Sequence, residues 1–188
     1  MADDLDAAVR AIASGDLVVY PTDTLLGLGA SAKDARAVVA LLAAKDRPSG
    51  MPISIAVSSI EEIEPWVAWS RESRALARRL LPGPVTLLVP ASRRARRELA
   101  PTLVGPDGTL GVRVPDHPIA RELARRVGPI TATSANRHGA RPCRTAREAR
   151  RVFGERVAAY LSQGPAPSGR PSDLVDLRRD APRLVARG

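Results

Sequence analysis

Short apolar runs alternate with amphipathic segments along most of this chain of 188 residues. Apolar runs that are bounded by Pro, Gly, Ser or Asp predict buried strands. Segments in which apolar residues recur every three or four positions predict helices that pack one face on a core. We expect strands at residues 17–20, 53–57, 85–89, 109–114, 129–132, 157–161, 174–177 and 184–186.

The predicted helices fall between these runs. Leu5, Val9 and Ile12 share one face of a first helix that Gly15 ends. Thr145 and Glu148 have the spacing of a capping box, for a helix that ends near residue 153. Further helices are expected at residues 33–44, 71–81, 92–99 and 119–127. Strands that alternate with helices, without strict βαβ regularity, predict an α/β fold in which residues 1–188 form a single domain with a twisted, mixed open sheet.

Composition narrows the class of protein. The chain is nearly half apolar but has only five aromatic residues, so Val, Leu, Ile and Ala must build its core. It has no apolar run near the roughly 20 residues that span a bilayer. A single cysteine, Cys143, excludes an internal disulfide and a cysteine-cluster metal site. With an acidic, amphipathic N-terminus that is unlike a signal peptide, these features favour a soluble cytoplasmic protein.

The charge favours a polyanionic partner. The formal net charge is +9, which suits a nucleic acid or the phosphates of a nucleotide. The basic residues are 27 Arg and 2 Lys, and such a bias can equally reflect a GC-rich genome. Lys45 stands out against this bias, as if a compact ammonium were needed there.

The stretch at residues 20–29 is the first candidate site. It follows an apolar run, and Pro21 ends the strand. Thr22, Asp23 and Thr24 then supply two hydroxyls and a carboxylate, while two glycines allow a close approach of the backbone. Polar groups between a strand and a helix are where open α/β sheets place ligands. The alternative is a plain strand-to-helix turn.

Four later segments could converge on this stretch, namely residues 45–48, 82–86, 111–117 and 133–136. In an extended segment Lys45 and Arg47 would point the same way and face one pocket, whereas the alternative is a solvated basic loop. Arg113 lies in an apolar strand, so it must meet an anion that comes either from the protein or from a ligand. Residues 133–136 follow a strand and form either a polar site or a capped turn.

Familiar catalytic motifs are absent. The sequence contains no phosphate-binding G-x-x-x-x-G-K-[ST] loop, no G-x-S-x-G motif and no histidine pair with metal-ligand spacing. Residues 27–29 lack the third glycine of a dinucleotide-binding fingerprint. With only His117 and His138, a histidine-dependent triad is not expected.

Together these segments resemble the YrdC/Sua5 (TsaC) family, the threonylcarbamoyl-AMP synthases, in their short single-domain form. The resemblance covers nearly the whole chain and follows the order of the family's motifs. The matching segments are residues 20–24 with 27–29, 45–48, 82–86, 112–118, 133–136 with Gly139, and Ser172 before residues 174–176.

The resemblance implies a fold and a reaction. The fold would be a twisted α/β sheet around a positively charged cavity. The reaction would convert L-threonine, bicarbonate (or CO2) and ATP to threonylcarbamoyl-AMP and pyrophosphate, the first step of t6A modification at position 37 of tRNA. Mg2+ would arrive with ATP, and the product would pass to tRNA or to the downstream threonylcarbamoyl-transferase machinery, with no membrane involved.

The resemblance also implies roles for individual residues. Lys45 and Arg47 would be the catalytic residues that hold the ATP phosphates. Thr22, Arg113 and Ser172 would bind threonine, Arg113 through its carboxylate. The remaining nucleotide contacts would be Thr109, Ser134, Asn136, Cys143 and Arg187.

Several positions depart from the family pattern. Leu26 stands where many members have Tyr, which predicts a differently shaped threonine pocket. Ala56 stands where some members have His, and Cys143 where some have Ser. His138 replaces the usual Ser before Gly139. Asp173 replaces the usual Thr and adds a negative charge near a site for anions.

Two other functions remain open from the sequence. A tRNA- or double-stranded-RNA-binding module could use a basic cavity without catalysis, and its binding would fall steeply with salt. A carbamoyl-adenylate role, as in the YrdC-like domain of hydrogenase maturation factors, would normally come with acylphosphatase and zinc-finger parts that this sequence lacks.

Overall fold

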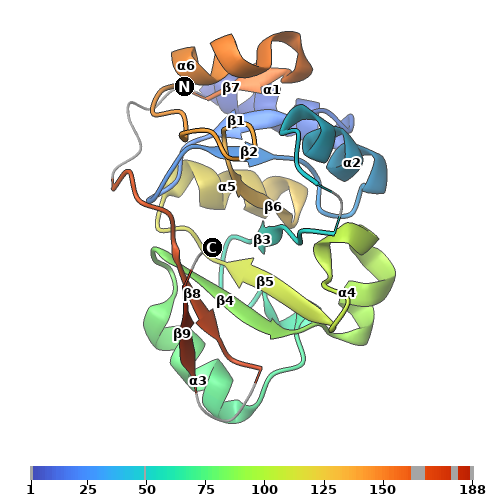
Figure 1. Cartoon of the computed structure of the whole chain (residues 1–188), viewed down its shortest axis with the longest axis vertical. Helices are drawn as coiled ribbons and strands as arrows, with labels where there is room; N and C mark the ends of the chain where they lie inside the picture. The colour runs from blue at the N-terminus through green and yellow to red at the C-terminus, as the bar shows by residue number, and fades with distance from the viewer. Residues whose placement is uncertain (1, 49, 162–167, 179–181, 187–188) are drawn as a thin grey trace.

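One mixed β-sheet organises the fold (Figure 1). The structure is a computed structural model that describes residues 2–48, 50–161, 168–178 and 182–186. In this part of the chain nine strands lie in the order β7-β1-β2-β6-β3-β5-β4-β8-β9. Neighbours are parallel in β1–β7, β3–β5 and β4–β8 and antiparallel elsewhere, so the predicted mixed open sheet is confirmed. The strands are Val18–Tyr20 (β1), Gly27–Gly29 (β2), Ser54–Ala56 (β3), Val85–Pro90 (β4), Thr109–Arg113 (β5), Ile130–Ser134 (β6), Ala159–Tyr160 (β7), Asp173–Asp176 (β8) and Arg183–Val185 (β9).

The helices α2, α3, α4 and α6 begin where the sequence supplies a side-chain cap. Asp34 accepts hydrogen bonds from the amides of the first turn of α2, and Ser92 caps α4. Thr145 accepts a hydrogen bond from the amide of Glu148, as the capping-box spacing predicts. The helices are Ala2–Ala13 (α1), Ala35–Ala44 (α2), Arg71–Leu80 (α3), Arg93–Glu98 (α4), Pro118–Val127 (α5) and Ala146–Phe153 (α6).

The sheet carries a hydrophobic cluster on each face. Tyr20 of β1 and Ile130 of β6 belong to a cluster that packs against Ile12 of α1 and Leu123 of α5. Val19, the neighbour of Tyr20, faces a larger cluster on the other side, which includes residues of α2, α4 and α6. This alternation along the strands is the normal consequence of β geometry. In Figure 1, α1 and α6 lie beside β7, at the opposite end of the sheet from β8 and β9. Among the described residues no helix is long and apolar enough to cross a membrane.

One strand was missed by the sequence prediction. Residues 20–29 do not form a strand-to-helix turn, because Gly27–Gly29 is a strand that pairs antiparallel with β1. The stretch is therefore a hairpin whose loop carries the polar residues. Gly27 and Gly29 hide this strand, because glycine is normally depleted in strands and offers no side chain to pack.

Tyr20 explains both glycines. A Cβ atom on Gly27 would lie 2.6 Å from the ring carbon Cζ of Tyr20, and a Cβ on Gly29 would lie 2.9 Å from its Cε1. The ring therefore lies across the bare backbone of β2. Its hydroxyl donates a hydrogen bond to the carbonyl of Thr131 in β6, at 2.9 Å. What comes close to the glycine backbone is thus the protein's own aromatic ring.

This packing predicts the effect of a single methyl group. We expect Gly27→Ala to destabilise the fold by about 1–3 kcal/mol, because the new Cβ overlaps a fully buried ring. The measurement is the free energy of unfolding in urea. The matched control is the double variant Tyr20→Leu/Gly27→Ala, in which the shorter side chain vacates the space. The penalty of the alanine should shrink in that background, and strictly additive effects of the two substitutions would contradict the packing described here.

Candidate active site

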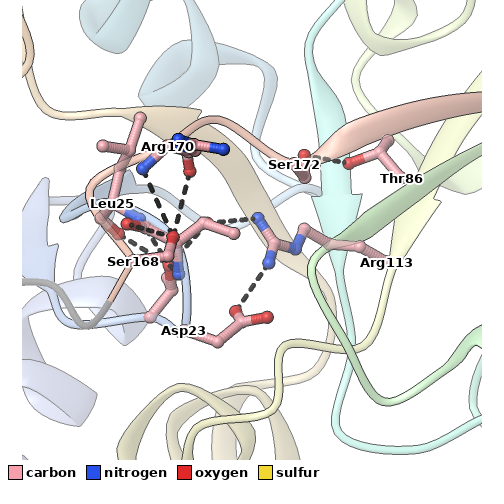
Figure 2. Close-up of polar contacts among 9 residues, drawn as sticks. Asp23, Leu25, Thr86, Arg113, Ser168, Arg170 and Ser172 are labelled. Atoms are coloured by element: carbon pink, nitrogen blue, oxygen red, sulfur yellow. Dashed lines mark hydrogen bonds and ion pairs between the residues drawn. The ribbon is translucent and has the colours of Figure 1, made fainter.

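The loop of the β1–β2 hairpin is held by one hydroxyl. Thr22 Oγ1 accepts hydrogen bonds from the amides of Thr24 and Leu25, at 3.1 and 3.2 Å, and donates one to the carbonyl of Leu25 at 2.6 Å. These local bonds are the usual way in which Thr fixes a turn. They place the side chains of Asp23 and Thr24 beside β5, where Figure 2 shows Asp23 pointing toward Arg113.

Arg113, the last residue of β5, forms a buried ion pair with this loop. Its Nη2 donates to Asp23 Oδ1 at 2.6 Å, and its Nη1 donates to Thr24 Oγ1 at 3.1 Å (Figure 2). The two ionic side chains are only 9% and 11% exposed. Burial lowers the pKa of Arg113, and the charge of Asp23 opposes that shift. Arg113 Nε and Asp23 Oδ2 are buried and have no hydrogen-bond partner among the described residues. The anion that the sequence required for Arg113 is therefore supplied, at least in part, by the protein.

A cavity of ≈ 200 Å³ lies beside this ion pair. Ile130 and Ala56 point into the cluster under α1 and α5, and residues two positions away on the same strands line the cavity, namely Ala132 and Ser54. The cavity therefore occupies the same face of the sheet where neither helix covers it. Its walls come from several loops and strands, and its lining residues are Tyr20, Thr22, Thr24, Leu25, Leu26, Gly27, Arg47, Pro52, Ile53, Ser54, Thr86, Arg113, Ala132, Thr133, Ser134, Pro142, Pro171 and Ser172.

Arg47 is the second cation on the cavity wall. Its Nε and Nη2 donate to the carbonyls of Met51 and Pro52, both at the long distance of 3.3 Å. No carboxylate in the described part of the chain lies within ion-pair distance of it. Partial burial lowers its pKa. In the part of the chain that the structure describes, Arg47 thus brings to the cavity a positive charge that is hydrogen-bonded to neutral carbonyl groups and has no carboxylate partner.

Lys45 does not lie beside Arg47 in the way that the sequence suggested. The intervening Asp46 has a positive φ of 50°, so the segment turns sharply and is not extended. Lys45 ends α2 and is only 2% exposed. Its Nζ donates to the carbonyls of Ser134 and, at 2.7 Å, of Asn136, and it is not among the residues that line the cavity.

Residues 134–136 form a tightly bonded turn at the end of β6. Ser134 Oγ donates to Asn136 Oδ1 at 2.6 Å, and Asn136 Nδ2 donates to two backbone carbonyls of the following loop. Both a capped turn and a polar wall are therefore present, since Ser134 lines the cavity whereas Asn136 serves the turn. Lys45 donates hydrogen bonds to two carbonyls of the same turn. Lys45, Ser134 and Asn136 are thus joined by hydrogen bonds, and of the three Ser134 lines the cavity.

The opposite wall comes from the last part of the chain. Ser172 and Thr86 of β4 share a hydrogen bond of 2.8 Å, and both line the cavity (Figure 2). The amide of Gly169 donates to the carbonyl of Thr24 at 3.0 Å, and Ser168 Oγ donates to the same carbonyl at 3.3 Å. The segment before β8 is therefore fastened to the hairpin loop. The composition of residues 164–171, rich in Gly, Pro and Ser, predicts a mobile loop, and residues 164–167 of it lie outside the described residues.

Not every predicted site residue lies at the cavity. Thr109 is at the opposite end of β5 from Arg113, where its hydroxyl accepts a hydrogen bond from Arg178 at 2.8 Å. Cys143 is buried outside the cavity lining, and burial raises the pKa of its thiol. Arg187 lies outside the described residues.

The departures from the family pattern are also placed. Leu26 lines the cavity, and Ala56 is buried under α1 and α5. Asp173 is exposed on β8. His138 is also exposed, and its amide donates a hydrogen bond to the carbonyl of Lys45.

Two parts of the site were missed from the sequence. Asp23 belongs to the hairpin motif but received no role, because its partner lies 90 residues away along the chain. Thr86 ends the segment at residues 82–86, and only the pairing of β4 with β8 shows that it faces Ser172.

Among the described residues no group of three or more His, Cys, Asp or Glu side chains is arranged to hold a metal ion.

Comparisons with known proteins agree on one family. The family model Sua5_yciO_yrdC, described as "Telomere recombination", matches residues 10–188. A "Putative threonylcarbamoyl-AMP synthase" of Mycobacterium tuberculosis is 41% identical over 183 residues, which are 97% of this chain and 82% of that protein. The "Threonylcarbamoyl-AMP synthase" of Photobacterium profundum is 31% identical over 95% of this chain and 96% of its own length.

A solved structure shows the same fold. It is Sua5 of P. abyssi "complexed with L-threonine", which superposes with a TM-score of 0.88 at 34% identity. The match covers 96% of this chain but only 52% of that one, so this chain spans about half of the length of the P. abyssi protein.

The burial of Lys45 leads to a prediction about stability and pH. Burial, and the nearby charge of Arg47, lower the pKa of Lys45 from 10.5 to about 8. Between these two values the unfolded chain binds more protons than the folded chain, so the contribution of Lys45 to stability rises with pH. The pKa shift corresponds to an increase in the free energy of unfolding of up to about 3 kcal/mol between pH 8 and pH 10.5.

The test compares urea unfolding of the wild type and Lys45→Met from pH 7 to pH 10.5. Groups other than Lys45 affect both proteins alike. The stability of the wild type relative to the variant should therefore increase as pH rises above 8. Parallel stability curves over this range would show that the ammonium is not held in the buried position described here.

Proposed function

We propose that this chain, which belongs to the Sua5/YciO/YrdC family, is an L-threonylcarbamoyladenylate synthase, a nucleotidyltransferase. It would convert L-threonine, bicarbonate or CO2, and ATP to threonylcarbamoyl-AMP and pyrophosphate. The names of its relatives support this activity, as does the complex of the P. abyssi protein with L-threonine. The product would serve the first step of t6A modification at position 37 of tRNA.

The observation that carries the proposal is the pair of guanidinium groups on one small cavity. Arg47 reaches it from the loop after α2, and Arg113 reaches it from the end of β5. Two separate cations match a reaction that joins a carboxylate-bearing amino acid to a polyphosphate. A volume of ≈ 200 Å³ is below the roughly 300–1,000 Å³ of typical sites for drug-sized ligands. It suits the amino acid and the reacting phosphate, with the adenosine extending beyond the cavity walls.

The chemistry needs positioning more than it needs a nucleophile. Once threonine carries a carboxylate on its nitrogen, an oxygen of that carboxylate attacks the α-phosphate of ATP, and the bond between the α-phosphate and the departing pyrophosphate breaks. The protein has to hold the two reactants together and to stabilise the charge that develops on the phosphate. Fixed cations and hydroxyls, such as those of this cavity, can do both.

Threonine would bind at the Arg113 side of the cavity. The guanidinium has five N–H groups, and its bonds to Asp23 and Thr24 leave further donors for the carboxylate of the substrate. Thr22 and Ser172 would supply hydroxyls to the same molecule, since both line the cavity.

ATP would bind at the Arg47 side. Arg47 would hold the phosphates, and Lys45 would assist, because an ammonium has three donors and the bonds to Ser134 and Asn136 use two of them. Mg2+ would enter with ATP as part of the substrate. The further proposed nucleotide contacts are Ser134, Asn136, Thr109, Cys143 and Arg187. Of the four that the structure describes, Ser134 lines the cavity.

The partners follow from the product. A mixed anhydride of a carbamic acid and AMP is reactive, so we propose direct transfer to tRNA or to the downstream threonylcarbamoyl-transferase machinery. The formal net charge of +9 supports an encounter with such a polyanion. We place the reaction in the cytoplasm, on the basis of the tRNA destination and of a chain with one cysteine.

Pyrophosphate release tests the proposal together with the role of Arg47. The assay contains ATP, Mg2+ and bicarbonate, with L-threonine, L-serine or no amino acid. We expect release that requires L-threonine. Arg47→Ala should lower kcat/KM by about 100-fold or more, because it removes a cation that stabilises charge on the transferred phosphate. The matched control is Arg125→Ala, which removes an exposed arginine of α5 that pairs with Glu122, and it should leave activity unchanged.

Two results would speak against this account. Threonine-dependent release that survives in Arg47→Ala would remove Arg47 from the phosphate site. Folded wild-type protein that releases no pyrophosphate but binds RNA, with an affinity that falls steeply with salt, would instead favour a non-catalytic RNA-binding module.

A further inference from the structure

The two arginines on the cavity wall differ in the charge that surrounds them. This difference matters under the proposed function, on which the inference rests, because one cavity must then sort two anionic substrates. A polyphosphate carries several negative charges and would be drawn to any exposed cation more strongly than a single carboxylate. If polyphosphate occupied both arginines, threonine could not bind.

Arg47 has no carboxylate partner among the described residues, and the charge of the Lys45 ammonium lies near it. Its two hydrogen bonds go to the backbone carbonyls of Met51 and Pro52, both at 3.3 Å. The neighbouring carboxylate of Asp46 is engaged elsewhere, at 3.3 Å from Arg137. The full positive charge of Arg47 is thus directed to whatever enters the cavity.

Arg113 is already paired with a carboxylate. Asp23 lies 2.6 Å from Nη2, and the pair is almost fully buried. Arg113 lines the cavity whereas Asp23 does not, so the carboxylate lies behind the guanidinium as seen from the cavity. The local turn of Thr22 holds Asp23 in that position, and Thr24 holds the other end of the guanidinium.

We propose that Asp23 is the residue that determines which anion Arg113 accepts. Its negative charge offsets that of the guanidinium, so the pair is neutral as a whole and attracts multivalent anions weakly. The oriented N–H groups that remain still fit a planar carboxylate. Arg113 therefore takes a monocarboxylate ligand, while phosphate chains collect at Arg47. Asp23 acts through Arg113 and is a positioning and specificity residue.

Competition between two small ligands tests this assignment. Isothermal titration calorimetry measures the affinity for L-threonine with and without inorganic pyrophosphate, for the wild type and Asp23→Asn. The asparagine can still accept the hydrogen bond from Nη2 but lacks the charge. In the wild type, pyrophosphate should change the Kd for threonine by less than about twofold. In Asp23→Asn, it should raise the apparent Kd by about tenfold or more, because pyrophosphate now competes for an uncompensated guanidinium.

The matched control is Asp6→Asn. Asp6 also pairs with an arginine, Arg126 at 2.5 Å, but on α1 and α5, away from the cavity. This variant should behave as the wild type does. A merely structural role for Asp23 would lower the unfolding temperature of Asp23→Asn without creating competition by pyrophosphate.

The possible outcomes distinguish a failure of the inference about Asp23 from a failure of the proposed function. Threonine binding in both proteins with no competition in Asp23→Asn would overturn the inference and leave the synthase proposal standing. Competition by pyrophosphate in the wild type would overturn it as well, and this arm needs no variant, so it holds even if Asp23→Asn fails to fold. A folded wild type that binds no threonine at all would overturn both.

Discussion

The buried ion pair between Arg113 and Asp23 is the interaction on which the rest of the site depends. It fastens the loop of the β1–β2 hairpin to the end of β5, two elements that are separated in the sheet by β6 and β3. Removing one partner of a buried pair leaves an uncompensated charge and typically destabilises a protein by about 3–5 kcal/mol. The pair therefore fixes the loop and the guanidinium relative to each other before any ligand arrives. That preorganisation is what a reaction without an enzyme nucleophile requires.

The cavity arises because the helices leave part of one sheet face uncovered. Under α1 and α5 the strands present apolar residues such as Ile130, and farther along the same strands they present Ser54 and Ser134. The hairpin loop, the loop after α2 and the segment before β8 close over this polar surface. Segments distant in sequence thus supply one cation each, Arg47 and Arg113, with hydroxyls between them.

Much of the fold could be predicted from the sequence, because buried strands and amphipathic helices leave strong local patterns. The strand β2 could not, since its glycines make sense only when the ring of Tyr20 lies over them. The prediction that Lys45 and Arg47 point the same way was wrong for a similar reason, because the positive φ of Asp46 turns the chain between them. Arg113 required an anion on physical grounds, but only tertiary structure identifies Asp23. The roles of the site residues came from the family resemblance, and Thr109 and Cys143 stay predictions that the cavity itself does not support.

The central claim is that one cavity receives threonine at Arg113 and the ATP phosphates at Arg47. A crystal structure of the chain with L-threonine and a non-hydrolysable ATP analogue tests it most directly. We expect the threonine carboxylate within hydrogen-bond distance of the Arg113 guanidinium, with Asp23 still paired behind it, and phosphate oxygens within hydrogen-bond distance of Arg47. Phosphate bound at Arg113, or threonine bound outside this cavity, would contradict the account.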